Sequence, residues 1–489
     1  MMMASFSLTE LAQALSAVIK QSAVIKNADT QADEIQAQRI NTDTRTIQQG
    51  DVFLALRGDN FDGHNYLKQA QTNGAIAAIV DVQYVADQTL LNSSLPLLVV
   101  TNTLLALGQA SLWNRQKFTG PLIAITGSAG KTSVKSMASH MMQLLGDCWA
   151  TQGNFNNHIG APLTLLGLEP QHKAAVIELG ASGAGEIAYT AQFAKPDVVI
   201  LTNVSSAHLE GFGSIEIIMR TKGEIIDALA GNGCAILNAD DIFYTDWVLR
   251  AGTRKVLSFG IENYADVMAK NIICDERGSR FDVVYQQQGV ACEVPLLGQH
   301  NVLNALSAIA AGLALGLELE KIVLQFKTLP MVDGRLQWVD GEGQIRILND
   351  SYNASPASVK AAIDVLALWQ EKAWLVLGDM AELGDDSAAI HAEIGEYAQQ
   401  KGIANFVATG TACRDAIAAF KQTLASQETA NRRAHWFEKQ SELLSYINEH
   451  KQPDQVFLVK GSRSAGMDKV VTALSLKSHI DSSNTIGKV

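Results

Sequence analysis

The sequence contains few cysteines and few prolines, and its net charge is negative rather than positive. Its five cysteines are scattered over 489 residues, and none forms a CxxC pair or has the spacing of metal ligands. This usage predicts free thiols in a reducing compartment, so we expect a cytoplasmic protein. The net charge of −12 argues against a general binder of nucleic acid or anionic membranes. It is compatible with an anionic small substrate, because such a substrate needs only local positive sites.

Long apolar runs are missing as well. Residues 1–15 lack a basic start and a continuous apolar core, so they do not predict a signal peptide. No apolar run approaches the ~18 residues of a membrane span, and we expect no membrane insertion. The length predicts about three domains, and the apolar content of 47% is ordinary for a globular protein.

Strand-like and helix-like segments alternate along most of the chain. We predict domains at residues 1–118, 119–329 and 330–489. The alternation predicts an α/β fold with mostly parallel sheets wrapped by helices, and a doubly wound sheet in the last domain. Residues 281–297 alternate more strictly, which favours antiparallel strands. The strands predicted beside the motifs below are Leu122–Thr126, Ala174–Glu178, Val198–Asn203, Cys234–Asn238, Ile345–Asp350 and Val456–Lys460.

A phosphate-binding loop is the strongest motif. Residues 123–133 predict a buried strand, a glycine turn and a helix start, an order in which backbone N–H groups and the helix dipole face an anion. Lys131 would reach the β- and γ-phosphates, and the Thr132 hydroxyl would bind Mg²⁺. Only two residues separate the two glycines, so the loop is shorter than GxxxxGK[ST]. The predicted cradle consists of Gly127, Ser128, Ala129, Gly130, Lys131, Thr132 and Ser133.

Two polar residues follow other predicted strands. Glu178 ends an apolar run, and a carboxylate beside a phosphate loop would hold Mg²⁺, although a solvated acid at a strand end is the alternative. His208 lies just past the strand at 198–203, where α/β ligand sites form. A lone histidine is more often structural, so the residues alone leave both interpretations of His208 open.

Lys222 lies on the apolar face of a predicted helix, residues 214–230. Four apolar side chains, three and four positions before and after it, share its face. Such a lysine either extends along the apolar surface to water or loses its solvation. Desolvation would lower its pKa and leave an amine that adds CO₂ to become an anionic carbamate. The residues alone favour extension to water.

Polar loops supply further candidates. Residues 151–162 carry Asn154, Asn156 and Asn157, which offer donors and acceptors to a polar ligand but also form ordinary Asx turns. Asn301 caps a predicted helix, which can be its whole role.

The C-terminal domain contains two more groups of candidates. Arg335 lies near the domain junction, and Asp350 and Tyr352 follow a predicted strand. A second group follows the strand at 456–460 and opens a helix, so charge and N–H donors together could clamp a carboxylate. This second group is Lys460, Ser462 and Arg463.

Together these motifs resemble those of the Mur ligases, the ATP-dependent amide-forming enzymes of peptidoglycan synthesis. The resemblance runs from Thr42-Asp-Thr-Arg45 to Lys460-Gly-Ser-Arg-Ser464, nearly the whole chain. The family's phosphate loop has the short form Thr-Gly-x-x-Gly-Lys-Thr, which matches residues 126–132. The most specific segments are Asn154-Phe-Asn-Asn-His-Ile-Gly, Ala207-His-Leu-Glu-Gly-Phe-Gly, Asn349-Asp-Ser-Tyr-Asn-Ala-Ser-Pro, Gly378-Asp-Met-Ala-Glu-Leu-Gly and Val459-Lys-Gly-Ser-Arg-Ser.

The resemblance implies roles for single residues. The family's magnesium-binding glutamate and histidine fall on Glu178 and His208, and its carbamylated lysine falls on Lys222, which now favours the carbamate. The adenine-contacting asparagine matches Asn301. The implied catalytic residues are Lys131, His208, Lys222 and Arg335, with Asp350 and Tyr352 beside the nucleotide.

The resemblance also implies a three-domain arrangement. A small α/β domain would bind a uridine-diphosphate substrate, a central mostly parallel sheet would resemble P-loop ATPases, and the C-terminal domain would be Rossmann-like. One departure is Ala181-Ser-Gly-Ala-Gly185, where relatives commonly carry an Asn-His or similar pair, so side-chain roles there are in doubt. The first-domain residues implied to contact the substrate are Thr44, Arg45, Phe61 and His64.

Within the family, the chain is most similar to the members that add D-alanyl-D-alanine to UDP-N-acetylmuramoyl-tripeptide. The Asp-Asn-Pro-Arg run typical of the preceding ligase is absent. The resemblance therefore implies these two substrates, ATP, two Mg²⁺ ions and a Lys222 carbamate, and we expect a monomer. The alternatives are a ligase of the family with a different amine substrate, or a nucleotide-dependent binding or switch protein without ligase activity.

Overall fold

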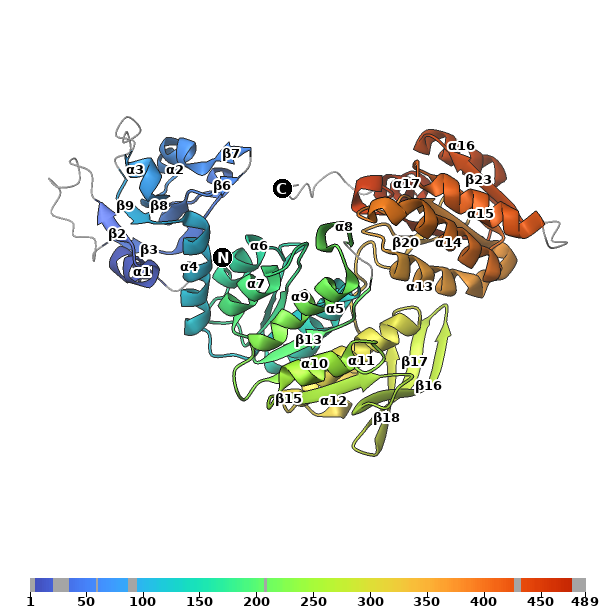
Figure 1. Cartoon of the computed structure of the whole chain (residues 1–489), viewed down its shortest axis with the longest axis horizontal. Coiled ribbons are helices and arrows are strands. Elements are labelled where there is room, and N and C mark those ends of the chain that lie inside the picture. The colour runs from blue at the N-terminus through green and yellow to red at the C-terminus, as the bar shows by residue number, and fades with distance from the viewer. Residues whose placement is uncertain are drawn as a thin grey trace.

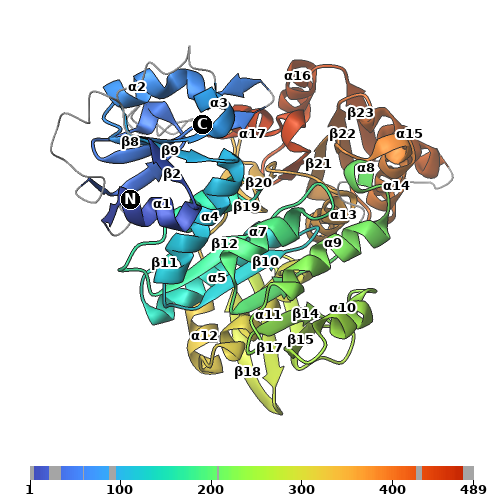
Figure 2. The same ribbon diagram turned by 60° about the vertical axis from the view of Figure 1, so that its left-hand side comes forward.

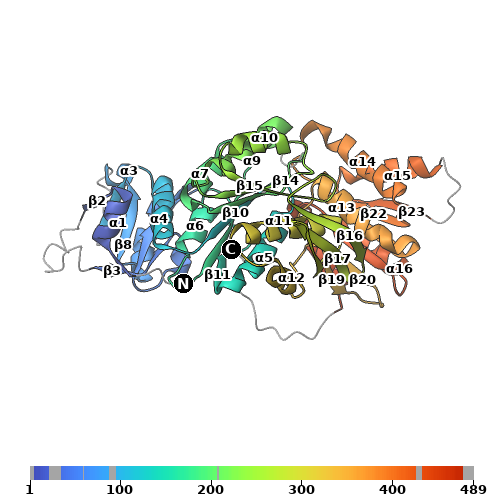
Figure 3. The same ribbon diagram turned by 90° about the horizontal axis from the view of Figure 1, so that it is seen from below.

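Three domains follow one another along the chain. The structure, a computed structural model, describes residues 5–20, 35–58, 60–86, 95–205, 209–425 and 432–476. The first and third domains lie on opposite sides of the middle one (Figure 1; Figure 3). Each domain is built on a mostly parallel sheet covered by helices, which confirms the predicted α/β fold class. The predicted limits between the domains stay predictions.

The first domain contains a five-stranded sheet in the order β2-β9-β8-β5-β4, parallel except for β2. Helices α1 and α4 pack on one face, and α2 and α3 on the other. Its strands are β1 (Phe6–Ser7), β2 (Val18–Lys20), β3 (Gln36–Ala37), β4 (Arg39–Asn41), β5 (Asp51–Leu54), β6 (Arg57–Gly58), β7 (Phe61–Asp62), β8 (Ala77–Asp81) and β9 (Leu97–Val100). Its helices are α1 (Leu8–Leu15), α2 (Leu67–Thr72), α3 (Val82–Ala86) and α4 (Thr103–Lys117).

The middle domain contains a nine-stranded sheet in the order β11-β12-β10-β13-β14-β15-β16-β17-β18. It is parallel up to β16, and β16, β17 and β18 are antiparallel, which confirms the pattern predicted for residues 281–297. The strands are β10 (Leu122–Thr126), β11 (Cys148–Ala150), β12 (Ala174–Glu178), β13 (Val198–Leu201), β14 (Cys234–Asn238), β15 (Lys255–Gly260), β16 (Val267–Asp275), β17 (Gly278–Tyr285) and β18 (Gln288–Val294).

Two groups of helices bury the two faces of this sheet. Along β10, Ile123 and Ile125 point to one core and Leu122 and Ala124 to the other, as the two-residue repeat of a strand requires. The helices on the first face are α5 (Lys131–Met142), α11 (Gln299–Ala314) and α12 (Leu319–Phe326). Those on the second are α6 (Gly160–Leu166), α7 (Glu186–Ala194), α9 (Ile215–Asp227) and α10 (Tyr244–Ala251), and the short α8 (Leu209–Phe212) precedes α9.

The third domain is a doubly wound sheet in the order β19-β20-β24-β21-β22-β23, parallel except at the β19 edge. Helix α13 begins with Ser355 as N-cap and Pro356 in the first turn. The strands are β19 (Gln337–Asp340), β20 (Arg346–Asp350), β21 (Ala373–Gly378), β22 (Asn405–Thr409), β23 (Arg433–Phe437) and β24 (Val456–Lys460). The helices are α13 (Pro356–Leu366), α14 (Ser387–Gln400) and α15 (Cys413–Ala425) on one face, and α16 (Gln440–His450) and α17 (Asp468–Leu474) on the other.

Helix α4 joins the first domain to the middle one, and it lies between them in Figures 1 and 2. Buried Asn114 donates hydrogen bonds to the carbonyls of Leu165 and Leu168 at the end of α6, both at 2.9 Å. Buried Arg115 donates to the Ala194 carbonyl at the end of α7 (2.9 Å). These hydrogen bonds tie α4 to the C-terminal ends of α6 and α7, where carbonyls lack the usual i+4 donor of a helix. Among the described residues, no helix has the length and apolar character needed to cross a bilayer.

Candidate functional site

The phosphate loop has the predicted geometry. Gly127 and Gly130 have φ of +148° and +82°, and α5 begins directly afterwards. Such values are accessible to glycine and strained for other residues, so the two glycines set the turn. The Lys131 ammonium lies back across the loop and donates to the Gly127 carbonyl at 2.6 Å. Burial, the largest effect, lowers the pKa of Lys131, opposed by the nearby Glu178 carboxylate.

Residues that directly follow β13 form hydrogen bonds with the phosphate loop. The N–H groups of Ser128 and Ala129 donate to the backbone carbonyl and the Oδ1 of Asn203, both at 2.9 Å. The Thr202 hydroxyl donates to the Ala129 carbonyl at 2.7 Å. Two of the expected cradle amides are therefore engaged by Asn203 in this arrangement. The donors left for a phosphate are those of the first turn of α5, which have no acceptor within the helix.

Glu178 is buried at the carboxyl end of β12, with 2% of its surface exposed, so the solvated-acid interpretation does not hold. Asn156 Nδ2 donates to Oε1 at 2.8 Å, and Lys135 Nζ lies 3.2 Å from Oε2. Oε2 accepts no hydrogen bond among the described residues. A buried carboxylate oxygen with spare lone pairs has the chemistry that Mg²⁺ prefers.

Lys222 lies on α9 as predicted, and its side chain is buried rather than extended to water. It is 2% exposed, its Nζ donates to the Ala181 carbonyl at 3.3 Å, and its ammonium lies 5.3 Å from the centre of the Phe212 ring. Burial, followed by repulsion from Lys131, lowers the pKa of Lys222 to about 7. Ala181 belongs to the segment 181–185 that departs from the family pattern, and it contacts Lys222 through its backbone carbonyl.

A cavity of about 270 Å³ lies between the middle and third domains. The middle domain contributes the phosphate loop, the end of β13 and the start of α11, and the third domain contributes the segment before β19 and the start of α13. The carboxyl ends of parallel strands thus meet a helix N-terminus, the usual place of an α/β ligand site. The predicted residues that line it are Ala129, Gly130, Thr132, Ser133, Asn301, Arg335, Asp350 and Lys460.

Arg335 lines this cavity with a cationic side chain that has one unpaired donor. Its guanidinium carbon lies 4.5 Å from the centre of the Tyr352 ring, a cation–π distance. Its Nε is buried and finds no hydrogen-bond acceptor in the described part of the chain. Asp350 is already paired, because Lys460 Nζ lies 2.5 Å from its Oδ2. Arg335 is therefore a cation that an anionic ligand in the cavity would satisfy.

The structure separates the three residues predicted to form one carboxylate clamp. Lys460 is 1% exposed and bridges Asp350 and the Asn353 carbonyl. Ser462 is buried and donates to the Asp379 carbonyl at 2.6 Å. Arg463 is exposed, with its guanidinium carbon 5.8 Å from the Tyr352 ring centre. Of the three, only Arg463 is exposed to solvent.

The three loop asparagines also differ in role. Asn156 contacts Glu178, whereas Asn157 Oδ1 accepts from the Gly160 N–H at 2.8 Å and so caps the start of α6, the ordinary Asx arrangement. Asn154 has an exposed side chain. Asn301 is not the predicted helix cap, because α11 begins at Gln299 after Gly298; it is buried and accepts from Asn304 Nδ2 at 3.1 Å beside the cavity. His208 lies outside the described residues.

In the first domain, three candidates are accessible and one is not. Thr44 and Arg45 lie on an exposed turn, where Arg45 pairs with Asp43 at 2.6 Å, and Phe61 is 55% exposed. His64 is buried at 4%; its Nε2 accepts from the Asp81 N–H and its Nδ1 contacts an Asp62 oxygen at 2.6 Å. Both ring nitrogens are engaged, so His64 shapes this region and offers no free group to a substrate.

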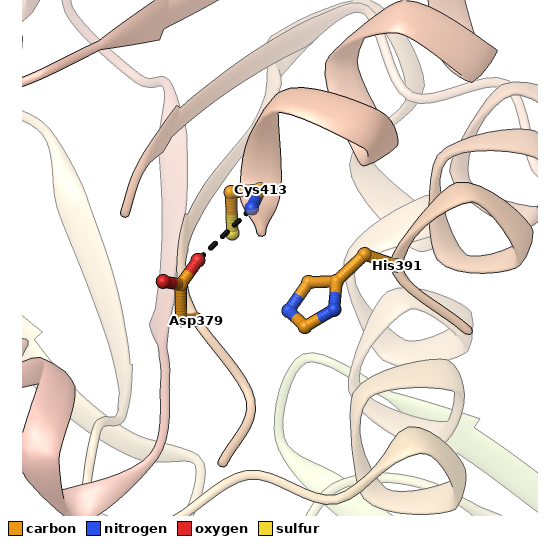
Figure 4. A group of neighbouring side chains, drawn as sticks. All are labelled: Asp379, His391 and Cys413. Carbon is orange, nitrogen blue, oxygen red and sulfur yellow. Dashed lines mark hydrogen bonds between the residues drawn. The ribbon is translucent and has the colours of Figure 1, made fainter. Parts of the chain in front are cut away.

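A second polar cluster, in the third domain, consists of Asp379, His391 and Cys413 (Figure 4), with ligand-type atoms within 4.8 Å of one another. His391 Nε2 accepts from the Met380 N–H at 3.0 Å, so Nδ1 carries the proton and donates to the Ser387 carbonyl at 2.7 Å. Burial raises the pKa of the Cys413 thiol well above its usual value. With both imidazole nitrogens used and the thiol protonated, the cluster fits a structural role.

Several residues at the site were not predicted from the sequence. Lys135, Asn203, His300 and Asn304 contact or line it. Burial lowers the pKa of His300 to about 4, so its ring is neutral there. A signal existed for Lys135, which stands one helical turn after Lys131 on the same face. Asn203 ends a predicted strand, the same position that singled out Glu178.

Comparisons with known proteins agree with this geometry. Sequence profiles of the Mur ligase family match residues 36–109 (Mur ligase family, catalytic domain), 125–312 (Mur ligase middle domain) and 334–463 (Mur ligase, glutamate ligase domain). The UDP-N-acetylmuramoyl-tripeptide–D-alanyl-D-alanine ligase of Escherichia coli is 39% identical over 94% of this chain and 98% of its own.

Solved structures are similar over the same extent. A crystal structure of MurF from Acinetobacter baumannii matches with a TM-score of 0.86 and 32% identity, over 96% of this chain and 98% of that one. MurF from Thermotoga maritima in complex with ADP matches with a TM-score of 0.76 and 26% identity, over 89% and 96%. Because its sequence and its fold are similar to those of Mur ligases over nearly the whole length, the chain belongs to the Mur ligase family.

Proposed function

We propose that this protein uses ATP to join D-alanyl-D-alanine to UDP-N-acetylmuramoyl-tripeptide. The products are UDP-N-acetylmuramoyl-pentapeptide, ADP and phosphate, in peptidoglycan precursor synthesis. The E. coli relative carries this activity in its name and aligns with nearly the whole chain. We further propose that the protein acts in the cytoplasm as a monomer.

The observation that carries the proposal is the half-buried guanidinium of Arg335, which lines the cavity and whose Nε finds no acceptor among the described residues. A cation that lines a cavity with one buried donor left without an acceptor favours an anionic ligand there. The first turn of α5, with its free N–H groups, lines the same cavity. ATP fits between them, with its phosphates on α5 and its base toward Asn301 and Asn304.

The chemistry follows from this placement. The tripeptide carboxylate attacks the γ-phosphorus of ATP, ADP leaves, and an acyl phosphate forms. The dipeptide amine then attacks the acyl carbon, loses a proton, and expels phosphate through a tetrahedral intermediate. Lys131 leaves the Gly127 carbonyl to contact the phosphates, and Arg335 stabilises the charge that develops on the transferred group.

The residues near the loop fit magnesium. We propose that the Thr132 hydroxyl and Glu178 hold one ion, since Glu178 Oε2 is buried and lacks a hydrogen bond among the described residues. His208 and carbamylated Lys222 would hold a second. Bound Mg²⁺ neutralises charge on phosphoryl oxygens.

A carbamate on Lys222 would resolve a charge conflict. A cationic lysine cannot bind Mg²⁺, and this one already lies close enough to Lys131 to be repelled by it. With a pKa of about 7, the amine is largely neutral in mildly alkaline solution and can add CO₂ with loss of one proton. The product is a carboxylate-like anion of the kind that Mg²⁺ prefers.

Arg463 is proposed to bind the free carboxylate of the incoming dipeptide. The Tyr352 ring lies 4.5 Å from the Arg335 guanidinium and 5.8 Å from that of Arg463, so the two cations are within about 10 Å of each other. An extended dipeptide spans about 7 Å. An amine attacking near Arg335 would therefore leave the dipeptide carboxylate within reach of Arg463. Asn154, the half-buried Thr44 and the exposed Arg45 and Phe61 would contact the nucleotide-sugar peptide.

The test is phosphate release from ATP and Mg²⁺ with UDP-N-acetylmuramoyl-tripeptide, with and without D-alanyl-D-alanine, together with mass spectrometry of the product. We expect release that depends on both substrates and a product heavier by one dipeptide. Release with single amino acids instead would assign the protein to a different amine substrate. Nucleotide binding without any release would contradict the ligase itself.

A further inference from the structure

Lys135 is a buried charge next to the reaction centre that the proposed chemistry does not use. It stands on α5 one turn after Lys131 and is 8% exposed. Burying an ammonium is unfavourable unless fixed partners replace its water. Two such partners are present on two different segments of the middle domain.

The first partner is the Glu178 carboxylate, with Lys135 Nζ 3.2 Å from Oε2. The second is the Gly153 carbonyl, which accepts from the same ammonium at 3.0 Å. Gly153 belongs to the loop that carries Asn154 and Asn156. One side chain on the phosphate-loop helix therefore contacts both the carboxylate proposed to bind Mg²⁺ and the loop proposed to face the peptide substrate.

Asn156 completes a closed set of contacts. Its Nδ2 donates to Glu178 Oε1 at 2.8 Å, and its backbone carbonyl accepts from the Gly180 N–H at 2.8 Å. The Glu178 N–H in turn donates to the Thr151 hydroxyl at 2.9 Å, at the base of the same loop. Each carboxylate oxygen thus has a cationic or amide group beside it. A carboxylate restrained at both oxygens presents its remaining lone pairs in one direction.

We propose that Lys135 is a positioning residue for the ligase reaction, fixing the Glu178 carboxylate and the 151–156 loop as one unit with the phosphate loop. The proposal rests on the proposed function of Glu178. It explains why a lysine is buried here, since an apolar side chain of similar length would leave Glu178 Oε2 without this counter-charge and the Gly153 carbonyl without this donor. Partners that orient a metal ligand typically contribute 10–100-fold to metal affinity.

Whether removal of Lys135 weakens or strengthens Mg²⁺ binding distinguishes a positioning role from the effect of a nearby positive charge. If Lys135 acted only as a nearby positive charge, its removal would strengthen Mg²⁺ binding, because one repulsive charge would be gone. If it fixes Glu178, removal weakens Mg²⁺ binding despite the lost repulsion. A purely structural ion pair would lower the melting temperature and leave the Mg²⁺ dependence unchanged.

The experiment compares Lys135→Met and Lys135→Arg with the wild type and with Lys321→Met, a control that removes an exposed lysine on α12. Calorimetry measures ADP binding over a range of Mg²⁺ concentrations, and hydrogen exchange of residues 151–157 is followed without metal. For Lys135→Met we expect roughly tenfold weaker apparent Mg²⁺ affinity and faster loop exchange. Lys135→Arg should recover part of both, and Lys321→Met should match the wild type.

Each remaining outcome decides the question. Unchanged or tighter Mg²⁺ binding in Lys135→Met, with the wild type responding normally to Mg²⁺, would overturn the positioning role alone. A wild type whose ADP binding does not respond to Mg²⁺ would contradict the proposed function of Glu178 instead. If Lys135→Met does not fold, Lys135→Arg is compared with the wild type in the same two measurements. Arginine keeps the positive charge and changes the geometry of the contacts with Glu178 and Gly153.

Discussion

Besides Lys135, three lysines lie at the proposed reaction centre, and their partners give them different chemistry. Lys460 is compensated by Asp350, and Lys131 lies against backbone carbonyls that a phosphate can replace. Lys222 has one long contact to a carbonyl and an aromatic ring beside it. Burial without a close anion is what lowers its pKa to about 7, and this makes it the lysine suited to react with CO₂.

Replacing Lys222 by methionine, which keeps the volume, should lower kcat by about 100-fold or more, because it removes a proposed metal ligand. Acetate should restore part of the activity, since it can supply a carboxylate in place of the carbamate. Acetamide, with the same shape and no charge, is the control and should restore nothing. Steady-state phosphate release measures all three. Wild-type turnover in Lys222→Met would exclude the carbamate role.

The same group predicts a pH dependence. Below about pH 7 the amine of Lys222 is mostly protonated and cannot add CO₂, and above that value it is mostly neutral. The carbamate fraction should therefore rise with pH through this range and fall when CO₂ is removed. Carbon-13 NMR of wild-type protein in labelled bicarbonate, compared with Lys222→Met, measures it. A wild-type carbamate signal that does not change between pH 6 and pH 8 would contradict this reading.

At the scale of one element, the helix α5 and its preceding glycine form the core of the proposed nucleotide site. Gly130 has φ +82° and ψ −11°, and a Cβ at this position would lie 2.5 Å from Asn304 Oδ1. Gly185, before α7, has φ +83° and ψ −11°, with nothing within 4 Å of its Cβ position. The two glycines therefore share the backbone strain and differ only in the steric contact.

Gly130→Ala and Gly185→Ala should each lose about 1–2 kcal/mol of stability to the left-handed backbone. Only Gly130→Ala should also lose nucleotide affinity, by roughly tenfold or more, because the methyl group must displace Asn304 from the cavity. Thermal unfolding and ADP titration measure the two effects. Equal ADP affinities in the two variants would show that the contact with Asn304 does not matter.

Local elements were predicted well because their signals are contiguous. The strands β10, β12, β14 and β24 have the predicted bounds. The helix around Lys222 begins after the predicted Ser214 and ends somewhat earlier than expected. The short edge strand β19 was missed, since a four-residue strand with partly exposed side chains has little periodic signal.

At the scale of the whole molecule, the two joints between domains differ. Helix α4 fixes the first domain to the middle one through buried hydrogen bonds from Asn114 and Arg115. The third domain meets the middle one around the cavity, with an exposed ion pair between Arg346 and Glu276 at 3.0 Å. An exposed pair of this kind contributes about 1 kcal/mol at most. We therefore expect the ligand to hold the third domain in place, as in domain closure around a substrate.

Hydrogen exchange with and without ADP and Mg²⁺ tests this coupling. Protection should increase in residues 129–133, 300–304 and 350–361, on both sides of the cavity, because the ligand contacts both domains. Residues 35–58 and 60–86 of the first domain should exchange unchanged, since the cavity does not reach them. Protection confined to the middle domain would show that the nucleotide does not engage the third.

By itself, the sequence determined the features that depend on neighbouring residues. The phosphate loop and the alternating strands follow from backbone torsions and side-chain periodicity over a few positions. The tertiary structure alone decided which distant groups meet: Lys460 with Asp350, 110 residues apart, and Lys135 with Glu178. It also left Arg335 Nε without an acceptor among the described residues. It also decided that Lys222 is buried and that His64 is not free. Strand order and packing set these distances and burials, and both are properties of the assembled fold rather than of any local segment.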